Sequence, residues 1–295
     1  MLRLFRVKPV EPFGDDGRMA LADHLRELRA RLLMVVLTLI AGIVVAWFFY
    51  GTLFDFLLDP YQQARVKLEA EGVRTEPVIS GVATSLLLQL KISALAAVVA
   101  TSPFWLYQIW AFVTPGLHAH ERRWTKLFSL VAGPLFLAGV AVGYYVLPKG
   151  MEVLIGFTPS AIQSLVDFNT YFSFIIRMLL VFGISFEIPL FVVLLNLAGV
   201  VSGKALAAYR PWIVVGTFVF AAVATPSTDP FSMVMLAIPM TLLFLVSETI
   251  ARFNDRRRAR SRGDDDVSGL DDEEQSVIEG PSGGISRSRL GEDDD

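Results

Sequence analysis

The stretch LLMVVLTLIAGIVVAWFFYGTLF, residues 32–54, runs for 23 residues without a charge. A bilayer core of about 30 Å needs about 20 apolar residues in a helix, so this stretch is long enough to cross it. Five further apolar runs follow at residues 92–113, 127–147, 172–197, 212–224 and 231–247. The sequence therefore predicts an all-α integral membrane protein with six transmembrane helices.

The last two runs are short, with 13 and 17 residues. At a rise of 1.5 Å per residue, the first of them covers only about 20 Å. It is either a full span in a locally thinned bilayer or one arm of a re-entrant hairpin, and both interpretations stay open. The link at residues 225–230 contains two prolines and predicts a tight turn between the two runs.

Composition excludes whole classes of protein. The chain is 54% hydrophobic and only 19% charged, whereas soluble domains are about 25% charged. Because there is no cysteine among the 295 residues, disulfides, thiol nucleophiles and cysteine-ligated metals are excluded. The three histidines lack metal-ligand spacing, and neither a nucleophile elbow nor a phosphate-binding loop is present. We therefore expect a binding or translocation protein without metal or cofactor, and not an enzyme.

The basic residues predict the orientation. Most Lys and Arg residues outside the runs fall in residues 1–31, the second-to-third link, the fourth-to-fifth link and residues 252–262. Because cytoplasmic loops carry an excess of Lys and Arg, both termini should be cytoplasmic. The first run is too long for a signal-peptide core, so we expect it to stay uncleaved.

Three regions are expected along the chain. Residues 1–18 should form a flexible N-terminal segment and residues 19–253 the membrane domain. Residues 254–295 begin with a basic juxtamembrane stretch, after which a tail from Gly263 holds mostly Gly, Ser, Asp and Glu and should be disordered. Residues 55–85 are expected to form short helices that cap the external face.

Two acidic residues stand out in the cytoplasmic segments. In DHLRELRARLL, residues 23–33, helical spacing places His24, Glu27 and Arg31 on one face of an amphipathic helix. Glu27 either pairs with Arg31 at i,i+4 or presents its carboxylate to a cationic ligand. Glu121, beside Arg122 and Arg123, is either an ordinary acid at the start of the next helix or a second such carboxylate.

A third acid lies inside a span. Glu187, in FGISFEIP at residues 182–189, falls near the middle of the fourth run. An ionisable group there costs at least about 2.5 kcal/mol on insertion scales, so Glu187 is a functional candidate unless a neighbour simply satisfies it by a hydrogen bond. Pro189 removes one helix hydrogen bond close by. Arg177 is about 15 Å away along the helix and is expected to reach the outer interface.

These segments together resemble the TatC family, the polytopic subunit of the twin-arginine protein translocase. The matching motifs lie in order along the chain, at residues 24–32, 102–112, 120–123, 182–189, 225–226, 229 and 236–240. The resemblance covers residues 21 to 253. It implies a concave, glove-like bundle with an external cap, in the bacterial cytoplasmic (inner) membrane.

The resemblance also implies a function and its residues. The chain would bind twin-arginine signal peptides of folded cargo at the cytoplasmic face and, with single-span subunits of the TatA and TatB type, export that cargo using the proton motive force. The implied signal-peptide site comprises Glu27, Glu121, Phe112, His24, Arg29, Arg122 and Arg123. Glu187 and Pro189 would meet a partner in the membrane, and Pro60 and Asp229 would act in the external loops.

Partners and alternatives follow from the same resemblance. We expect a hetero-oligomer with several copies, embedded in lipid and without nucleic acid. A secondary transporter or channel is the alternative, although only Glu187 and Arg177 are charged inside the spans. An intramembrane hydrolase would need a nucleophile–base pair that the sequence does not show.

Overall fold

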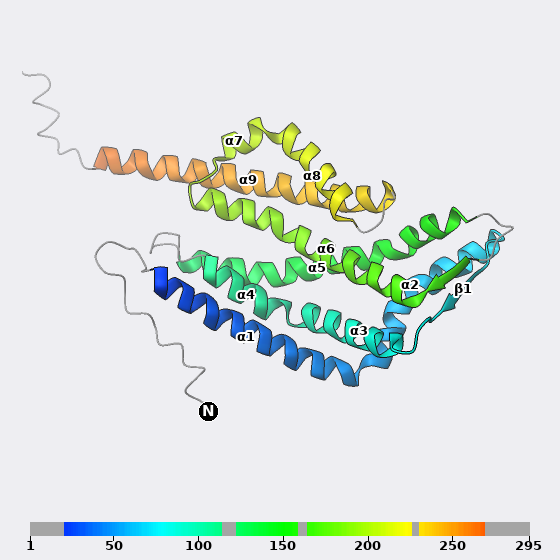
Figure 1. Ribbon diagram of the computed structural model, residues 1–295. Coiled ribbons are helices and arrows are strands. Elements are labelled where there is room, and N and C mark those ends of the chain that lie inside the picture. Colours follow the sequence, from blue (N-terminus) through cyan, green and yellow to red (C-terminus); the bar gives the residue numbers. More distant parts are fainter. Residues whose placement is uncertain (1–20, 114–121, 159–163, 226–229, 269–295) are drawn as a thin grey trace, which may run out of the picture.

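The computed structural model describes residues 21–113, 122–158, 164–225 and 230–268. Nearly all of these residues are helical, and two short strands complete the fold (Figure 1). The elements in chain order are α1 (Leu21–Phe48), α2 (Tyr50–Ala70), β1 (Thr75–Val78), α3 (Thr84–Ala100), α4 (Ser102–Val113), α5 (Arg122–Gly156), β2 (Ser164–Asp167), α6 (Phe168–Leu197), α7 (Gly203–Ala208), α8 (Arg210–Ala224) and α9 (Pro230–Ser268).

The helices form layers around one central pair. Helices α5 and α6 pack on each other along their length, with α3 and α4 on one side and α9 on the other. Helix α1 lies outside α3 and α4, while α7 and α8 lie outside α9 (Figure 1). The beginning of α1 and the end of α4 lie at one end of the bundle, and α2 and β1 lie at the opposite end.

Glycine residues let the central pair approach closely. A Cβ atom added to Gly139 of α5 would lie 2.6 Å from the carbonyl oxygen of Phe182 in α6. One added to Gly143 would lie 3.0 Å from the Cβ atom of Phe182, and one added to Gly183 would collide with the ring of Phe136. Small residues four apart are a common device for packing helices inside a bilayer, where the hydrophobic effect does not draw helices together.

Four helices within the described ranges are long and apolar enough to cross a membrane, namely His24–Phe48, Leu130–Gly156, Phe168–Leu197 and Pro230–Arg257. Each of the four overlaps a run predicted from the sequence. Helices α3 and α4 together would make a fifth span, bent by 59° at their junction. Helix α8 is apolar but has only 15 residues, fewer than the four spanning helices.

The predicted end of the first span, residue 54, lies six residues beyond the observed end of α1. Helix α1 stops at Phe48 and α2 begins at Tyr50, so residues 50–54 belong to the cap. The Phe54 ring lies 5.2 Å from the ring of Phe172 and 6.1 Å from that of Phe168, measured between ring centroids. These apolar residues are therefore used to bury the cap against α6, and not to extend the span.

The second predicted span, residues 92–113, corresponds to two helices joined at a bend. Its predicted start also lies eight residues after the observed start of the first of these helices. Helix α3 starts at Thr84, and the chain bends at Thr101 before α4 begins. Pro103 follows directly, in the first turn of α4. Backbone N–H groups in a first turn make no helical hydrogen bond, so the missing N–H of proline costs nothing there. The hydroxyls of Thr101 and Ser102 donate to the carbonyl oxygens of Ala97 and Val99, which satisfies two carbonyls at the break.

Residues 55–85, the expected external cap, do not form the several short helices predicted. The cap consists of the single 21-residue helix α2 and of β1, which pairs in parallel with β2. The Tyr61 hydroxyl, 3.1 Å from the Thr75 hydroxyl, ties α2 to β1. The predicted all-α fold is confirmed, and this one strand pair was not foreseen, because residues 75–78 find their partner strand almost 90 residues further on.

The last helix continues beyond its predicted end. Helix α9 runs from Pro230 to Ser268 and passes through Gly263, where the tail was expected to begin. The predicted boundary between residues 253 and 254 therefore falls inside this helix. The rest of the tail lies outside the described residues.

Candidate functional site

The first half of α1 and the second half of α4 together present a small polar cluster. The guanidinium of Arg31 donates to Oε1 of Glu27 through Nε at 2.8 Å and Nη2 at 2.5 Å. Its Nη1 donates to Oε1 of Gln108 in α4 at 3.1 Å. Arg31 therefore joins the two helices, and the i,i+4 pair predicted within α1 is present.

An aromatic stack completes the cluster. The rings of His24 and Phe112 lie 4.3 Å apart between centroids, with an interplanar angle of 14°. His24 is one helical turn before Glu27, and Phe112 is one turn after Gln108, so both helices contribute residues at the same relative positions. The structure thus brings together His24, Glu27 and Phe112, three of the seven residues expected in the site.

Glu27 keeps one carboxylate oxygen available. Both Arg31 contacts fall on Oε1, and Oε2 accepts no hydrogen bond from the residues that the structure describes. The side chain is 14% exposed. A carboxylate that is paired with one arginine and has its second oxygen open can accept a further N–H donor, and a guanidinium is the donor whose geometry fits best.

The remaining predicted residues of this site are only partly described. Arg29 is exposed on α1. Glu121 lies outside the described residues, and Arg122 and Arg123 open α5 without described side chains. The helices on either side of the 114–121 connection are packed together, because the ring of Trp110 stacks on that of Phe128 at 5.6 Å.

Glu187 lies between α6 and α4. Both of its carboxylate oxygens are buried, and neither makes a regular hydrogen bond to a described residue. The Trp110 indole is its polar neighbour. Among the described residues, the hydrogen-bonded structural role that the sequence left open for Glu187 is therefore limited to this indole, and the carboxylate keeps capacity to accept further hydrogen bonds.

The other predicted positions lie on α6, on α2 or outside the described residues. The carbonyl oxygen of Pro189 accepts a hydrogen bond from the Ser247 hydroxyl at 2.9 Å, which links α6 to α9. Pro60 is buried inside α2. Asp229, the last external-loop residue expected, lies outside the described residues. Arg177 is exposed on α6, and its reach to the outer membrane interface stays a prediction.

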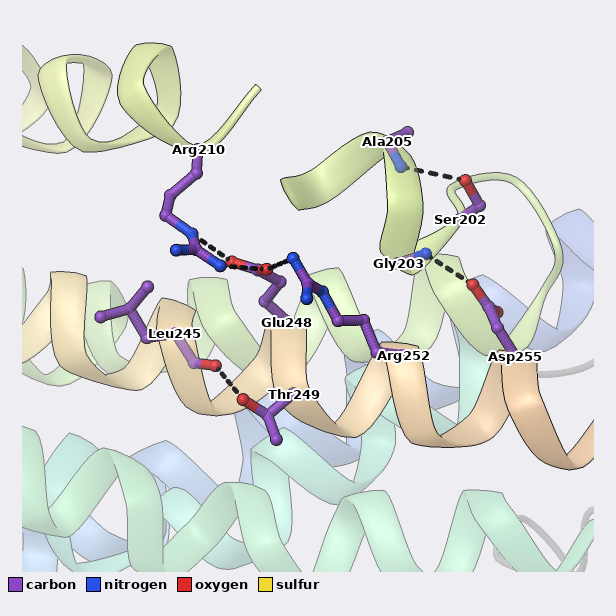
Figure 2. A network of polar contacts seen from close by, with 9 residues as sticks. All are labelled: Ser202, Gly203, Ala205, Arg210, Leu245, Glu248, Thr249, Arg252 and Asp255. Atoms are coloured by element: carbon purple, nitrogen blue, oxygen red, sulfur yellow. Dashed lines mark hydrogen bonds and ion pairs between the residues drawn. The ribbon is translucent and has the colours of Figure 1, made fainter. Parts of the chain in front are cut away.

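Sequence reasoning missed a second carboxylate cluster (Figure 2). Glu248 of α9 accepts from Nε and Nη2 of Arg210 at 2.9 and 2.7 Å, and it pairs with Nη2 of Arg252 at 2.7 Å. Its side chain is only 3% exposed. The spacing of Glu248 and Arg252, four residues apart, was a usable signal, whereas Arg210 lies 38 residues away and gave none.

A neighbouring acid holds the start of α7. Asp255 accepts from the backbone N–H of Gly203 at 2.6 Å and from the Asn196 amide at 2.9 Å. Together with Glu248 it fastens the segment between α6 and α8 onto α9. Both acids therefore have evident structural roles.

Comparison with known proteins agrees with this architecture. Residues 23–239 match the family described as "Sec-independent protein translocase protein (TatC)". A protein of that name from Frankia casuarinae is 43% identical over 270 residues, which cover 90% of this chain and 74% of the relative. One from Haemophilus influenzae is 33% identical, covering 81% of this chain and 91% of the relative.

A solved structure extends the likeness to the fold. A crystal structure described as "Twin Arginine Translocase Receptor- TatC in DDM" superposes with a TM-score of 0.64 at 32% identity. The match covers 77% of this chain and 99% of the other. The chain therefore belongs to the TatC family and is a subunit of a Sec-independent protein translocase, a non-enzymatic component of a membrane complex for protein transport.

Proposed function

We propose that the chain binds twin-arginine signal peptides at its cytoplasmic face, with Glu27 as one of the two carboxylates that receive the arginines. The observation that carries this proposal is the open Oε2 of Glu27 beside the stacked rings of His24 and Phe112. Arg31 fixes the carboxylate through Oε1, so the second oxygen faces a ligand without first having to be oriented. Lysine could not copy the planar fork of a guanidinium in this position.

Glu121 is the second carboxylate of the proposed site, and Arg29, Arg122 and Arg123 are its basic neighbours. The connection that carries Glu121 begins at the end of α4, next to Phe112. Two acids suit two consecutive arginines, and the nearby basic residues hold both acids charged while competing with the ligand.

The topology and partners complete the proposal. Six spans, formed by α1, the α3–α4 pair, α5, α6, α8 and α9, place both termini in the cytoplasm of a bacterium, with the bundle in its inner membrane. TatA- and TatB-type subunits pack against the concave, glove-like face, with several copies in the assembly. The buried carboxylate of Glu187, whose polar neighbour is the Trp110 indole, offers one of them a polar contact, with Pro189 beside it, whereas Pro60 and Asp229 act on the external side.

Site-specific photocrosslinking tests the signal-peptide site. A photoreactive residue at position 28 or 112, which leaves both acids in place, should crosslink to a signal peptide with two arginines and lose that crosslink when both are lysines. Position 66, on the exposed surface of α2 at the other end of the bundle, is the control and should give no crosslink. Crosslinking that is equal for the two peptides would contradict the proposal.

Charge reversal tests the separate role of Glu187. The Glu187→Lys variant should lose copurification with single-span subunits more severely than it loses signal-peptide crosslinking. Glu187→Gln keeps the shape of the side chain and should retain most of the assembly, since an amide still offers hydrogen bonds. Equal loss of assembly and crosslinking in Glu187→Lys would show that Glu187 acts on the whole fold.

A further inference from the structure

An open cleft of about 560 Å³ lies between α7 and α9. Lys204 and Ala207 of α7 form one wall, and Arg252, Asp255 and Arg256 of α9 form the other. Three of these five residues are cationic. The cleft lies at the same end of the bundle as the start of α1, away from α2 and β1 (Figure 1).

The acids beside the cleft are already engaged by other groups. Asp255 accepts from the Asn196 amide and from the Gly203 N–H. Glu248 is bound by Arg210 and Arg252 (Figure 2). Lys204 and Arg256 are exposed and form no ion pair with any side chain in the described ranges. The cleft therefore presents positive charge that the described residues leave unneutralised.

The walls of the cleft are held in a fixed relation. A Cβ atom added to Gly203 would lie 2.7 Å from the backbone nitrogen of Arg252, so the α7 backbone rests directly on that of α9. The Ser202 hydroxyl accepts from the Ala205 N–H at 3.1 Å and caps α7 (Figure 2). These contacts build a preformed site, and not merely a set of mobile surface cations.

Exposed apolar residues lie on α9, which forms one wall of the cleft, and on α8, which packs on α7 and α9. Trp212 of α8 is 75% exposed, and Val215 and Val219 continue this exposed apolar surface along the helix. Ile250 and Phe253 of α9 are exposed as well. Tyr209 and Trp212 mark the level at which aromatic side chains normally meet the membrane interface. Cations at that level, next to apolar helix faces, match a molecule with an anionic head and hydrocarbon chains.

We propose that the cleft binds the phosphate headgroup of an anionic phospholipid from the cytoplasmic leaflet, with the acyl chains lying along α8 and α9. Lys204, Arg252 and Arg256 contact the headgroup oxygens, while Glu248 and Asp255 keep α7, α8 and α9 in register. Basic pockets between helices on the cytoplasmic side are a recurrent form of lipid headgroup site. The acidic tail of the same chain is the competing occupant.

Native mass spectrometry of the purified full chain in detergent tests the site. Phosphatidylglycerol should be retained in preference to phosphatidylcholine. The Lys204→Gln/Arg256→Gln variant should bind phosphatidylglycerol about tenfold more weakly, since two surface cations are lost. Both residues lack ion-pair partners among the described side chains, so the unfolding temperature of this variant should stay close to that of the parent. A loss of affinity without a change in unfolding temperature supports the site.

A matched control removes two cations elsewhere. Lys67→Gln/Arg74→Gln carries the same change in charge at the opposite end of the bundle and should keep the parent's preference for phosphatidylglycerol. An equal loss in this control would show that overall charge governs binding and would overturn the proposal. Phosphatidylglycerol binding that appears only after the chain is truncated at Ser268 would assign the cleft to the acidic tail and would overturn it as well.

Discussion

The clusters around Glu27 and Glu248 contain similar residues and differ in what their carboxylates leave free. Both acids pair with arginines, and each cluster links two helices, through Arg31 to Gln108 of α4 in one and through Arg210 of α8 in the other. Glu248 has both oxygens occupied by two guanidiniums and is 3% exposed. Glu27 uses one oxygen for one guanidinium and is 14% exposed.

The difference separates a structural acid from one that can bind. A carboxylate accepts about four hydrogen bonds, and the number already made tells how much capacity remains for a ligand. At Glu248 the protein's own arginines already occupy both carboxylate oxygens, which an incoming guanidinium would need. At Glu27 only one of the two carboxylate oxygens is occupied by an arginine.

The largest effect should come from removing the charge of each acid. Glu27→Gln should reduce export of a twin-arginine reporter about 100-fold or more, because a neutral amide cannot form the charge-assisted pair with a guanidinium. Glu248→Gln should keep most of the export, since its shape and part of its hydrogen bonding remain. Periplasmic reporter activity, corrected for the amount of inserted protein, measures both.

Insertion must be shown separately for this comparison. Both variants should appear in the membrane fraction at parental levels. Adding Glu121→Ala to Glu27→Ala should abolish export and also the crosslinking to the signal peptide. Normal crosslinking of this double variant would remove Glu27 and Glu121 from the site.

For stability we expect the reverse order, with a larger loss from changing Glu248 than from changing Glu27. Glu248→Ala leaves Arg210 and Arg252 without their shared acid, and we expect a loss of about 2 kcal/mol in the free energy of unfolding. That figure lies at the lower end for broken buried pairs, because both guanidiniums are nearly half exposed and can turn to water. Glu27→Ala should cost less than about 0.5 kcal/mol, as for an ordinary i,i+4 pair. Thermal unfolding in detergent compares the two, and a larger loss at Glu27 would contradict our assignment.

The comparison also shows which features could be read from the sequence. The apolar runs and the face that carries His24, Glu27 and Arg31 were found, because span length and helical period are local properties. Stacking of His24 on Phe112 was not, since it depends on the packing of α1 on α4 across almost 90 residues. The pairing of β1 with β2 and of Arg210 with Glu248 escaped for the same reason. The proline at position 103 was a signal for the break between α3 and α4. That signal was not used, because the apolar run continues on both sides.

A smaller effect should follow from releasing Arg31. Gln108→Met keeps the volume of a buried side chain but removes the oxygen that accepts from Nη1 of Arg31. Arg31 then holds Glu27 from within α1 alone, and we expect signal-peptide affinity to fall about threefold to tenfold. Fluorescence anisotropy with a labelled signal peptide measures the change. Gln63→Met, an exposed change on α2, is the control, and equal losses would show that Gln108 does not act through the site.

The smallest effect should come from a carboxylate at the end of the bundle that carries α2 and β1, away from the Glu27 cluster. The Ser80 hydroxyl and then the Thr170 N–H lower the pKa of Asp167, which also caps the start of α6. Because the pKa is lower in the folded state, the stabilisation is full above the unfolded pKa of about 4 and is lost as the pH falls through the folded value. The difference in unfolding temperature between the parent and Asp167→Asn should therefore be constant near neutral pH and shrink in acid. A difference that grew in acid would mean that the neutral carboxyl is the favoured form, and that Asp167 does not act as the charged cap described.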